Sequence, residues 1–284
     1  MSVARPSRTA LGAAGHRAAH QVLEHGAIFF DPLAVRILGH QAAALIEHAR
    51  DPGQRRLRLF IAARSRFAED ALSRAVAAGV RQVVILGAGL DTWAYRSSFG
   101  GQLRVFEVDH PATQAWKRER LAEARIGLPP QLIFAPIDLE RESLADALAA
   151  ATFDPTECSF FSWLGVVPYL HEATVYSTLG FIAGLAGGAT VVFDYGNPLQ
   201  AAPSEATAAR AALAERVASA GEPFRSTFET HRLHSQLLSS GFEEIEDLGP
   251  AQIAARYVPG AASAAMTSAA PDRGGHLVRA RRVP

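Results

Sequence analysis

A short glycine-containing turn follows an apolar run in the first third of the sequence. Residues 83–86 read Val-Val-Ile-Leu, and Gly87-Ala88-Gly89 comes directly after them. A buried strand that ends in Gly-x-Gly and leads into a helix lets the backbone approach a ligand at the carboxyl edge of a sheet. The dinucleotide fingerprint needs a third Gly or Ala where helix and strand pack closely, and Thr92 occupies that position. The turn therefore indicates a nucleoside-type ligand but argues against NAD. It also lacks the Gly-Lys-Ser/Thr of a phosphate-binding loop.

Acidic residues stand at the ends of the next two predicted strands. Glu107 and Asp109 lie about 20 residues after the glycine turn, and Asp138 follows the strand after that. A carboxylate in the first of these places can accept both hydroxyls of a ribose, and its charge disfavours a phosphorylated ribose. Each acid taken alone could equally cap a helix. Together they favour an adenosine ligand without phosphates, and S-adenosylmethionine is such a ligand.

The spacing of apolar residues predicts an α/β fold that would position these groups. Short runs bounded by turn residues predict buried strands at 83–86, 103–108, 132–135, 159–163 and 190–193. Helical spacing predicts helices between several of them, such as 112–124 and 144–150. Strands that alternate with helices in this way are typical of βαβ units and a mostly parallel sheet with helices on both faces.

The two ends of the chain show a different pattern. Residues 1–78 are predicted to form a helical cap, with one helix starting after Asp31-Pro32 and another running through 57–76 and ending at Gly79. The cofactor-binding core is expected over 79–195. A helical insertion over 196–230 is expected to act as a lid. The last part, 231–284, is predicted to hold a helix at 231–240 and strands at 242–248 and 276–282, joined by a connection that is functional or partly helical.

Several motifs together resemble the leucine carboxyl methyltransferase family. They are Arg64-Ser65-Arg66-Phe67-Ala68-Glu69-Asp70, the segment 79–92 around the glycine turn, Phe106-Glu107-Val108-Asp109-His110-Pro111 followed by Lys117, and Ile137-Asp138-Leu139. Arg17-Ala18 and Phe30-Asp31-Pro32-Leu33-Ala34 are similar to the amino-terminal part of the family. The resemblance runs from about residue 10 to 195. It implies a class I methyltransferase (Rossmann-like) fold, S-adenosylmethionine as cofactor, and a bacterial branch that methylates small molecules.

The resemblance also implies roles for single residues of the cofactor site. Gly87 and Gly89 would admit the cofactor, and Asp109 would hold its ribose. The resemblance further implies that Arg64 and Arg66 would pair with the methionine carboxylate, and that Asp138 and the backbone of Leu139 would flank the adenine. Arg17 is a weaker candidate for the carboxylate site. An ordinary solvated helix face is the alternative interpretation of Arg64 and Arg66.

The sequence departs from the family pattern at Leu164. The family often carries a Glu before Gly-Val-x-x-Tyr-Leu, and this chain has Leu164 in that place. We expect Leu164 to line the cofactor channel by apolar contact or through its backbone. On the substrate side the candidates are Tyr169, Tyr195 and His231, but a histidine in such a helix is more often an ordinary surface or core residue. No catalytic base is assigned, because a carboxylate acceptor is already ionised at neutral pH.

Composition limits the remaining function classes. Lys and Arg total 28 and so do Asp and Glu, so the chain carries no net charge to attract nucleic acid. The single cysteine, Cys158, excludes a disulfide framework, and no spacing indicates a metal site. No apolar stretch reaches the about 20 residues of a membrane span, and we expect a cytoplasmic protein. The sequence leaves its oligomeric state open.

These observations predict an enzyme that transfers a methyl group from S-adenosylmethionine to a carboxylate or hydroxyl of a small molecule, with a role in secondary metabolism. A protein that binds S-adenosylmethionine without methyl transfer is the alternative, since Leu164 replaces the family acid. An NAD-dependent oxidoreductase is a distant third.

Overall fold

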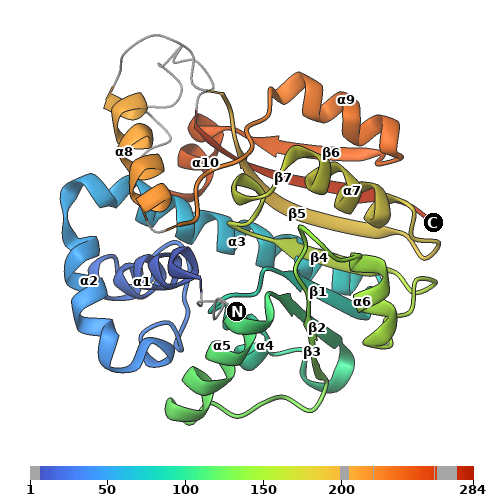
Figure 1. Cartoon of the computed structure of the whole chain (residues 1–284), viewed down its shortest axis with the longest axis horizontal. Coiled ribbons are helices and arrows are strands. Elements are labelled where there is room, and N and C mark those ends of the chain that lie inside the picture. The colour runs from blue at the N-terminus through green and yellow to red at the C-terminus, as the bar shows by residue number, and fades with distance from the viewer. Residues whose placement is uncertain (1–6, 199–204, 220, 259, 261–273) are drawn as a thin grey trace.

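One mixed sheet of seven strands forms the centre of the molecule (Figure 1). The computed structural model describes residues 7–198, 205–219, 221–258, 260 and 274–284. The strand order is β3-β2-β1-β4-β5-β7-β6. β1 to β5 are parallel to one another, and β7 runs antiparallel between β5 and β6. The strands are β1 (Gln82–Leu86), β2 (Arg104–Asp109), β3 (Leu132–Pro136), β4 (Ser159–Trp163), β5 (Ala189–Gly196), β6 (Glu244–Leu248) and β7 (Gly275–Arg282).

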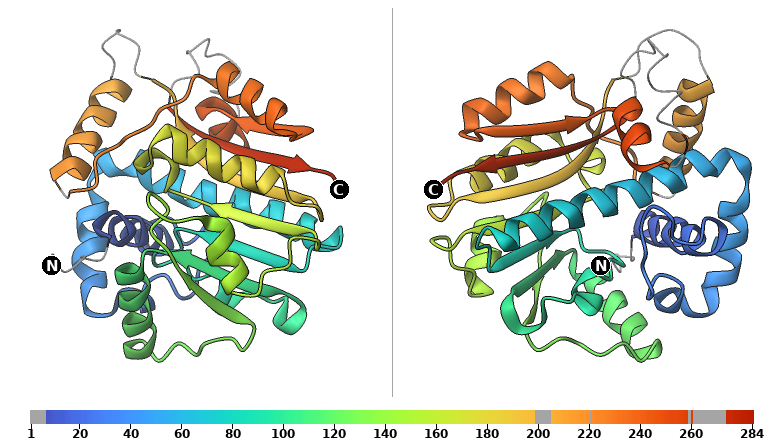
Figure 2. Two further views of the ribbon diagram at one scale, coloured as in Figure 1. Left: turned by 45° about the vertical axis from the view of Figure 1, so that its right-hand side comes forward. Right: turned by 180° about the vertical axis from the view of Figure 1, so that it is seen from behind.

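Helices cover both faces of this sheet (Figure 2). Alternate side chains of each strand point to opposite faces, so Val84 and Leu86 join one apolar cluster while Val83 and Ile85 join another. The first cluster includes side chains of α6 (Leu144–Ala150), α7 (Glu172–Ala183) and α9 (Thr230–Ser240). The second includes side chains of α3 (Arg55–Ala77), α4 (Trp93–Arg96) and α10 (Pro250–Tyr257). The prediction of an α/β fold with helices on both faces is therefore confirmed.

A third apolar cluster lies outside the two sheet layers. It joins α1 (Arg8–Leu23), the 3-10 helix η1 (Arg36–Gln41) and α2 (Ala42–Arg50) to α5 (Pro111–Glu123). Figure 1 shows α1 and α2 beside the end of the sheet that holds the glycine turn. The remaining helical elements are η2 (Pro52–Gln54), η3 (Gly100–Gln102), η4 (Val167–Tyr169) and α8 (Glu205–Ser219).

The predicted cap over residues 1–78 is narrower in the structure. α3 runs along one face of the sheet, where Leu59, Ala62 and Phe67 belong to the same apolar cluster as the strands. Only the helices before α3 lie outside the sheet layers. The segment after Asp31-Pro32 forms turns and the 3-10 helix η1 instead of a longer α-helix, and Gly39 interrupts η1 with φ +54° and ψ −131°.

The carboxyl-terminal part agrees with the predicted order of elements. α8 lies within the predicted insertion, and residues 199–204 and 220 of that insertion fall outside the described residues. The long connection between the last two predicted strands contains α10, so its partly helical alternative is confirmed.

A buried ion pair joins β2 to α5. The Nζ of Lys117, the only lysine of the chain, lies 2.8 Å from Oε1 of Glu107, and each side chain is only 1% exposed. Tyr95 donates a hydrogen bond of 3.0 Å to Oε2 of the same carboxylate. Burial raises the pKa of Glu107, and Lys117 opposes this rise. Glu107 therefore has a structural role and does not line the ligand site.

Replacing Lys117 by Met should lower the free energy of unfolding by about 3–5 kcal/mol, because it leaves the Glu107 carboxylate buried without its partner. Urea unfolding measures the change. Adding Glu107→Gln to the same chain should recover part of the loss. Arg50→Met removes an exposed pair with Glu47 and should cost less than about 1 kcal/mol. Equal losses for Lys117→Met and Arg50→Met would contradict the prediction.

Candidate functional site

A cavity of about 1790 Å³ opens at the carboxyl ends of β1, β2, β4 and β5. Its other walls come from α1, α2, α3 and α8 together with the chain that follows α8. Small-molecule sites usually have volumes of about 300–1000 Å³. The cavity therefore has room for a nucleoside cofactor and a second small molecule.

The glycine turn forms one end of this cavity. Gly87 and Gly89 have φ values of +62° and +43°, in the left-handed region that favours glycine. A Cβ on Gly87 would lie 2.3 Å from Cγ2 of Val166, and a Cβ on Gly89 would lie 3.0 Å from Cβ of Ala10. Both glycines line the cavity, as the sequence predicts. The backbone of the turn is thus packed closely against the loop after β4 and the first turn of α1.

Asp109 faces the same end of the cavity from the last residue of β2. Its two carboxylate oxygens accept hydrogen bonds from the backbone N–H groups of Gly89 and His110. Burial raises the pKa of Asp109, and these two N–H groups oppose the rise. Each carboxylate oxygen has a second lone pair, so the group keeps the capacity to accept hydroxyl hydrogens.

Asp138 also lines the cavity, whereas Leu139 is absent from its wall. Oδ1 of Asp138 accepts a hydrogen bond of 3.1 Å from the N–H of Glu140. The side chain of Leu139 is half-buried against the apolar cluster on the α6 and α7 face of the sheet. Asp138 is thus part of the cavity wall, and the contact of the Leu139 backbone with an adenine stays a prediction.

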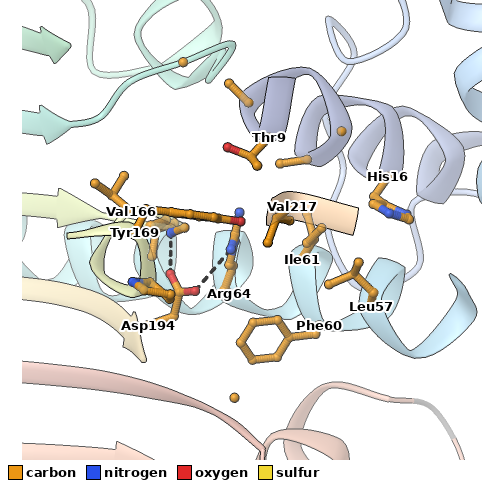
Figure 3. A pocket seen from close by; sticks show the side chains of 18 of the residues that line it. Thr9, His16, Leu57, Phe60, Ile61, Arg64, Val166, Tyr169, Asp194 and Val217 are labelled. Atoms are coloured by element: carbon orange, nitrogen blue, oxygen red, sulfur yellow. Dashed lines mark hydrogen bonds and ion pairs between the residues drawn. The ribbon is translucent and has the colours of Figure 1, made fainter. Parts of the chain in front are cut away.

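Arg64 and Arg66 separate onto different faces of α3. Arg64 points into the cavity (Figure 3), and its Nη1 lies 3.1 Å from Oδ2 of Asp194. Arg66 is not part of the cavity wall; its side chain is 53% exposed and forms an ion pair of 2.8 Å with Asp70. Two residues along a helix correspond to about 200° of rotation, so both arginines cannot face one site. The structure therefore brings Arg64, and not Arg66, to the cavity wall.

Two residues that position Arg64 were missed by the sequence prediction. Asp194 accepts a hydrogen bond from the N–H of Gly165 in addition to its contact with Arg64. Gly165 has φ +72°, and a Cβ there would lie 2.6 Å from Nη2 of Arg64. Asp194 directly follows the strand predicted at 190–193, the same kind of position that identified Asp109. Its place directly after a predicted strand is the sequence signal from which Asp194 could have been predicted.

Arg17 belongs to a buried network beneath the glycine turn. Its Nε donates to Oδ2 of Asp31 at 2.8 Å, and its Nη2 donates to the carbonyl of Leu90 at 2.5 Å. Thr92 donates to the same Asp31 oxygen at 2.7 Å, and Arg96 Nε lies 3.4 Å from the other. Arg17 lines the cavity, but its charge is already paired. Thr92 contributes its hydroxyl where the dinucleotide fingerprint has a small residue.

The residues predicted on the substrate side differ in whether they line the cavity. Tyr169 lines the cavity and points toward Arg64 (Figure 3), and burial raises its pKa to about 12. Tyr195 also borders the cavity, but it is 1% exposed and its hydroxyl donates a hydrogen bond to Asp247. His231 is exposed on α9 and is not part of the cavity wall, so it has no place in this site. Leu164 does line the cavity, as expected.

Two other kinds of site were sought in the part of the chain that the structure describes. No group of three or more His, Cys, Asp or Glu side chains there could hold a metal ion. No helix among those residues has the length and hydropathy needed to cross a membrane.

Comparison with known sequences identifies a matching family and several similar proteins. Residues 10–183 match the leucine carboxyl methyltransferase family. The Bacillus subtilis protein named "Putative S-adenosyl-L-methionine-dependent methyltransferase YktD" is 35% identical over 195 residues, which cover 67% of this chain and 63% of that protein. The Frankia alni protein named "Putative S-adenosyl-L-methionine-dependent methyltransferase FRAAL3718" is 37% identical over 185 residues, which cover 63% and 64%. The chain thus spans less than two thirds of the length of either relative.

Solved structures share the fold over nearly the whole chain. A crystal structure described as a "putative methyltransferase" from Thermobifida fusca has a TM-score of 0.58 at 16% identity and covers 100% of this chain and 97% of that one. A DUF574 family protein from Streptomyces avermitilis has a TM-score of 0.53 at 18% identity, with coverage of 94% and 96%. Together with the observed strand order, these similarities confirm the class I methyltransferase fold.

Asp31→Asn should lower the free energy of unfolding at neutral pH by about 3 kcal/mol, because it removes the charge that compensates buried Arg17. Burial alone would raise the pKa of Asp31, but Arg17 and Arg96 outweigh it and hold the pKa below its ordinary value of 3.8. A carboxyl with a lowered pKa stabilises the fold above its ordinary pKa, and this contribution is lost as pH falls through the lowered value.

The gap in stability between the native chain and Asp31→Asn should therefore shrink as the pH falls below the ordinary pKa of 3.8. Urea unfolding at neutral pH and at about pH 3 measures both values. Asp70→Asn is the control: its partner Arg66 is exposed, so the loss should stay under about 1 kcal/mol. A gap that is independent of pH would contradict the assigned charge on Asp31.

Proposed function

Because the chain belongs to the leucine carboxyl methyltransferase family, we propose that it transfers a methyl group from S-adenosylmethionine to a carboxylate or hydroxyl of a small molecule. One observation carries the proposal: a single cavity brings together the glycine turn, Asp109 and Arg64. The names of the relatives support the choice of cofactor. The volume of about 1790 Å³ supports a second small molecule beside it. Secondary metabolism is the context in which we place the reaction.

The residues at the glycine-turn end fit this cofactor. The backbone at Gly87 and Gly89 has no side chain that could block the approach of a ligand, and a Cβ there would meet neighbouring side chains. Asp109 has lone pairs left for the two ribose hydroxyls. Asp138 lies at the same end and can accept from the amino group of an adenine.

Arg64 fits the amino-acid end of the same cofactor. Its guanidinium carries five N–H donors, and the contact with Asp194 uses part of that capacity. The remaining donors can form a charge-assisted pair with the methionine carboxylate. Asp194 and Gly165 hold the guanidinium in place, so its position is set before a ligand arrives.

The bound cofactor would supply an electrophilic methyl group on a sulfonium, and the protein has to position the acceptor and exclude water. The apolar side chains of Leu164 and Val166 form part of the cavity wall beside the strand ends. Burial raises the pKa of Tyr169 to about 12, so its phenol gives up a proton less readily than a free tyrosine and is a poor candidate for a general base. A carboxylate acceptor needs no general base from this set, whereas a phenol acceptor would benefit from one.

A protein that binds S-adenosylmethionine without transferring its methyl group is the second candidate. It is favoured by Leu164, which stands where the family often has an acid. Binding of the cofactor without turnover across a panel of carboxylic acids and phenols would support it over the first proposal.

Asp109→Asn should weaken the binding of S-adenosylhomocysteine about 10- to 100-fold, because charge-assisted hydrogen bonds to the ribose hydroxyls are worth about 1.5–3 kcal/mol. Isothermal titration calorimetry measures the change. Asp146→Asn changes an exposed carboxylate that is not part of the cavity wall, and it should bind as the native chain does. If Asp109→Asn binds S-adenosylhomocysteine with unchanged affinity, Asp109 does not hold the ribose.

Arg64→Gln and Arg66→Gln form a matched pair on one helix. Arg64→Gln should reduce the affinity for S-adenosylhomocysteine about tenfold or more, because it removes the partner proposed for the methionine carboxylate. Arg66→Gln should leave that affinity unchanged, since its side chain is exposed and pairs with Asp70. Equal effects of the two substitutions would refute the assignment of Arg64.

A further inference from the structure

The cavity continues past the glycine turn into a space between α1, α2, α3 and α8. His16 of α1 and Leu57 of α3 line this far end, and Ile61 of α3 and Val217 of α8 lie between them and Arg64 (Figure 3). His16 follows Thr9 by seven residues on α1, and Leu57 precedes Arg64 by seven residues on α3. Seven residues of α-helix correspond to about 10 Å, so the far end lies roughly that distance from the proposed site of the methionine carboxylate.

His16 is a buried polar side chain without a partner. It is 8% exposed, and its Nδ1 is buried and makes no hydrogen bond to any residue that the structure describes. Buried polar atoms are nearly always hydrogen-bonded, because an unpaired one loses its interactions with water. Because Nδ1 is closed to solvent, Nε2 is the ring nitrogen left to contact a ligand in the cavity.

Positive charges surround the imidazole on several sides. Burial, together with the nearby basic groups Arg58, Arg216, His48 and Arg64, lowers the pKa of His16 to about 4. These four groups come from α2, α3 and α8, the elements that face α1 across the cavity. The imidazole is therefore neutral at neutral pH, and the electrostatic potential at its position is positive.

These cations differ in whether their charge is already compensated. Arg58 pairs with Glu24, and Arg64 pairs with Asp194. Arg216 lines the cavity and has no ion pair among the residues described here. Its charge is thus available to a ligand.

The charges along the cavity are divided between its two ends. The carboxylates of Asp91, Asp109, Asp138 and Glu140 line the wall near the glycine turn. Arg55, Arg56 and Arg216 line the opposite part, together with His16. Arg17 and Arg141 also line the wall near the glycine turn, so that end carries charges of both signs, whereas the far end presents positive charge to an anionic group.

We propose that the far end is an anion-binding subsite for the acceptor, where the neutral imidazole of His16 donates a hydrogen bond to a carboxylate and Arg216 supplies the opposite charge. The apolar body of the acceptor contacts Leu57, Ile61 and Val217. The distance to Arg64 makes this carboxylate an anchor, separate from the atom that receives the methyl group. The acceptor class is therefore an apolar small molecule whose anionic group is held about 10 Å from the site proposed for the methionine carboxylate.

The identification of the bound molecule as the methyl acceptor rests on the proposed function. The experiment therefore distinguishes a failure of the anion subsite from a failure of the proposed function. The probe is octanoate, and octanamide of the same length is the neutral comparison. Calorimetry measures the affinity for both probes, with and without saturating S-adenosylhomocysteine. Histidine NMR of the full chain follows the pKa of His16, whose resonances are assigned by their loss in His16→Gln.

Octanoate should bind at least about tenfold more tightly than octanamide, because only the carboxylate interacts with the positive potential. It should also raise the pKa of His16 from its value of about 4, since a negative charge beside the ring favours the imidazolium. Arg216→Gln changes an exposed side chain, so it should fold normally. It should reduce the preference for octanoate and raise the pKa of His16 in the free protein.

His16→Gln should also lose most of the preference for octanoate, whereas His40→Gln, an exposed histidine outside the cavity wall, should keep it. Equal binding of octanoate and octanamide, or a preference that survives both His16→Gln and Arg216→Gln, would overturn the anion subsite. Failure to bind S-adenosylhomocysteine would overturn the proposed function instead. Even if S-adenosylhomocysteine does not bind, the affinities of the native chain for octanoate and octanamide can still be measured and compared.

Discussion

The buried carboxylate of Asp31 is the constraint on which the geometry of the cavity depends. It receives Arg17 from α1 at 2.8 Å and the hydroxyl of Thr92 at 2.7 Å, while Arg96 lies 3.4 Å away. Arg17 also donates to the carbonyl of Leu90, directly after the glycine turn. α1 is thus tied to the turn by groups that are largely buried. Separating them would expose buried charges without partners, which is costly.

The two helices that line the cavity lengthwise determine where its chemistry lies. α1 places its first turn against Gly89 and, two turns later, places His16 at the far end. α3 places Arg64 near the strand ends and Leu57 at the far end. Because α3 is packed on the sheet and α1 is held by Asp31, the distance between the two ends is fixed by helix geometry. A long cavity with different charges at its ends follows from this arrangement.

The sequence predicted what depends on local pattern. Apolar runs gave the strands, and positions next to strand ends identified Gly87, Gly89 and Asp109 on the cavity wall. It could not decide between Arg64 and Arg66, because the choice requires knowing which face of α3 packs on the sheet. His231 was likewise placed by its residue type alone, and α9 turns it to solvent. Partners far apart in the chain, such as Arg64 and Asp194, leave no trace in local spacing.

The substitution at Leu164 can be understood from the residues beside it. The backbone of the next residue, Gly165, is held by a hydrogen bond to Asp194, and the Arg64 guanidinium packs against it. The side chain of Leu164 packs against the apolar cluster on the α3 face of the sheet. The position of the loop after β4 therefore depends on a carboxylate from β5, and the side chain at position 164 is not needed to hold it. A carboxylate at 164 would add a second negative charge near Asp194, which already neutralises Arg64. Leucine leaves that pairing undisturbed, so Arg64 keeps its position beside the cavity.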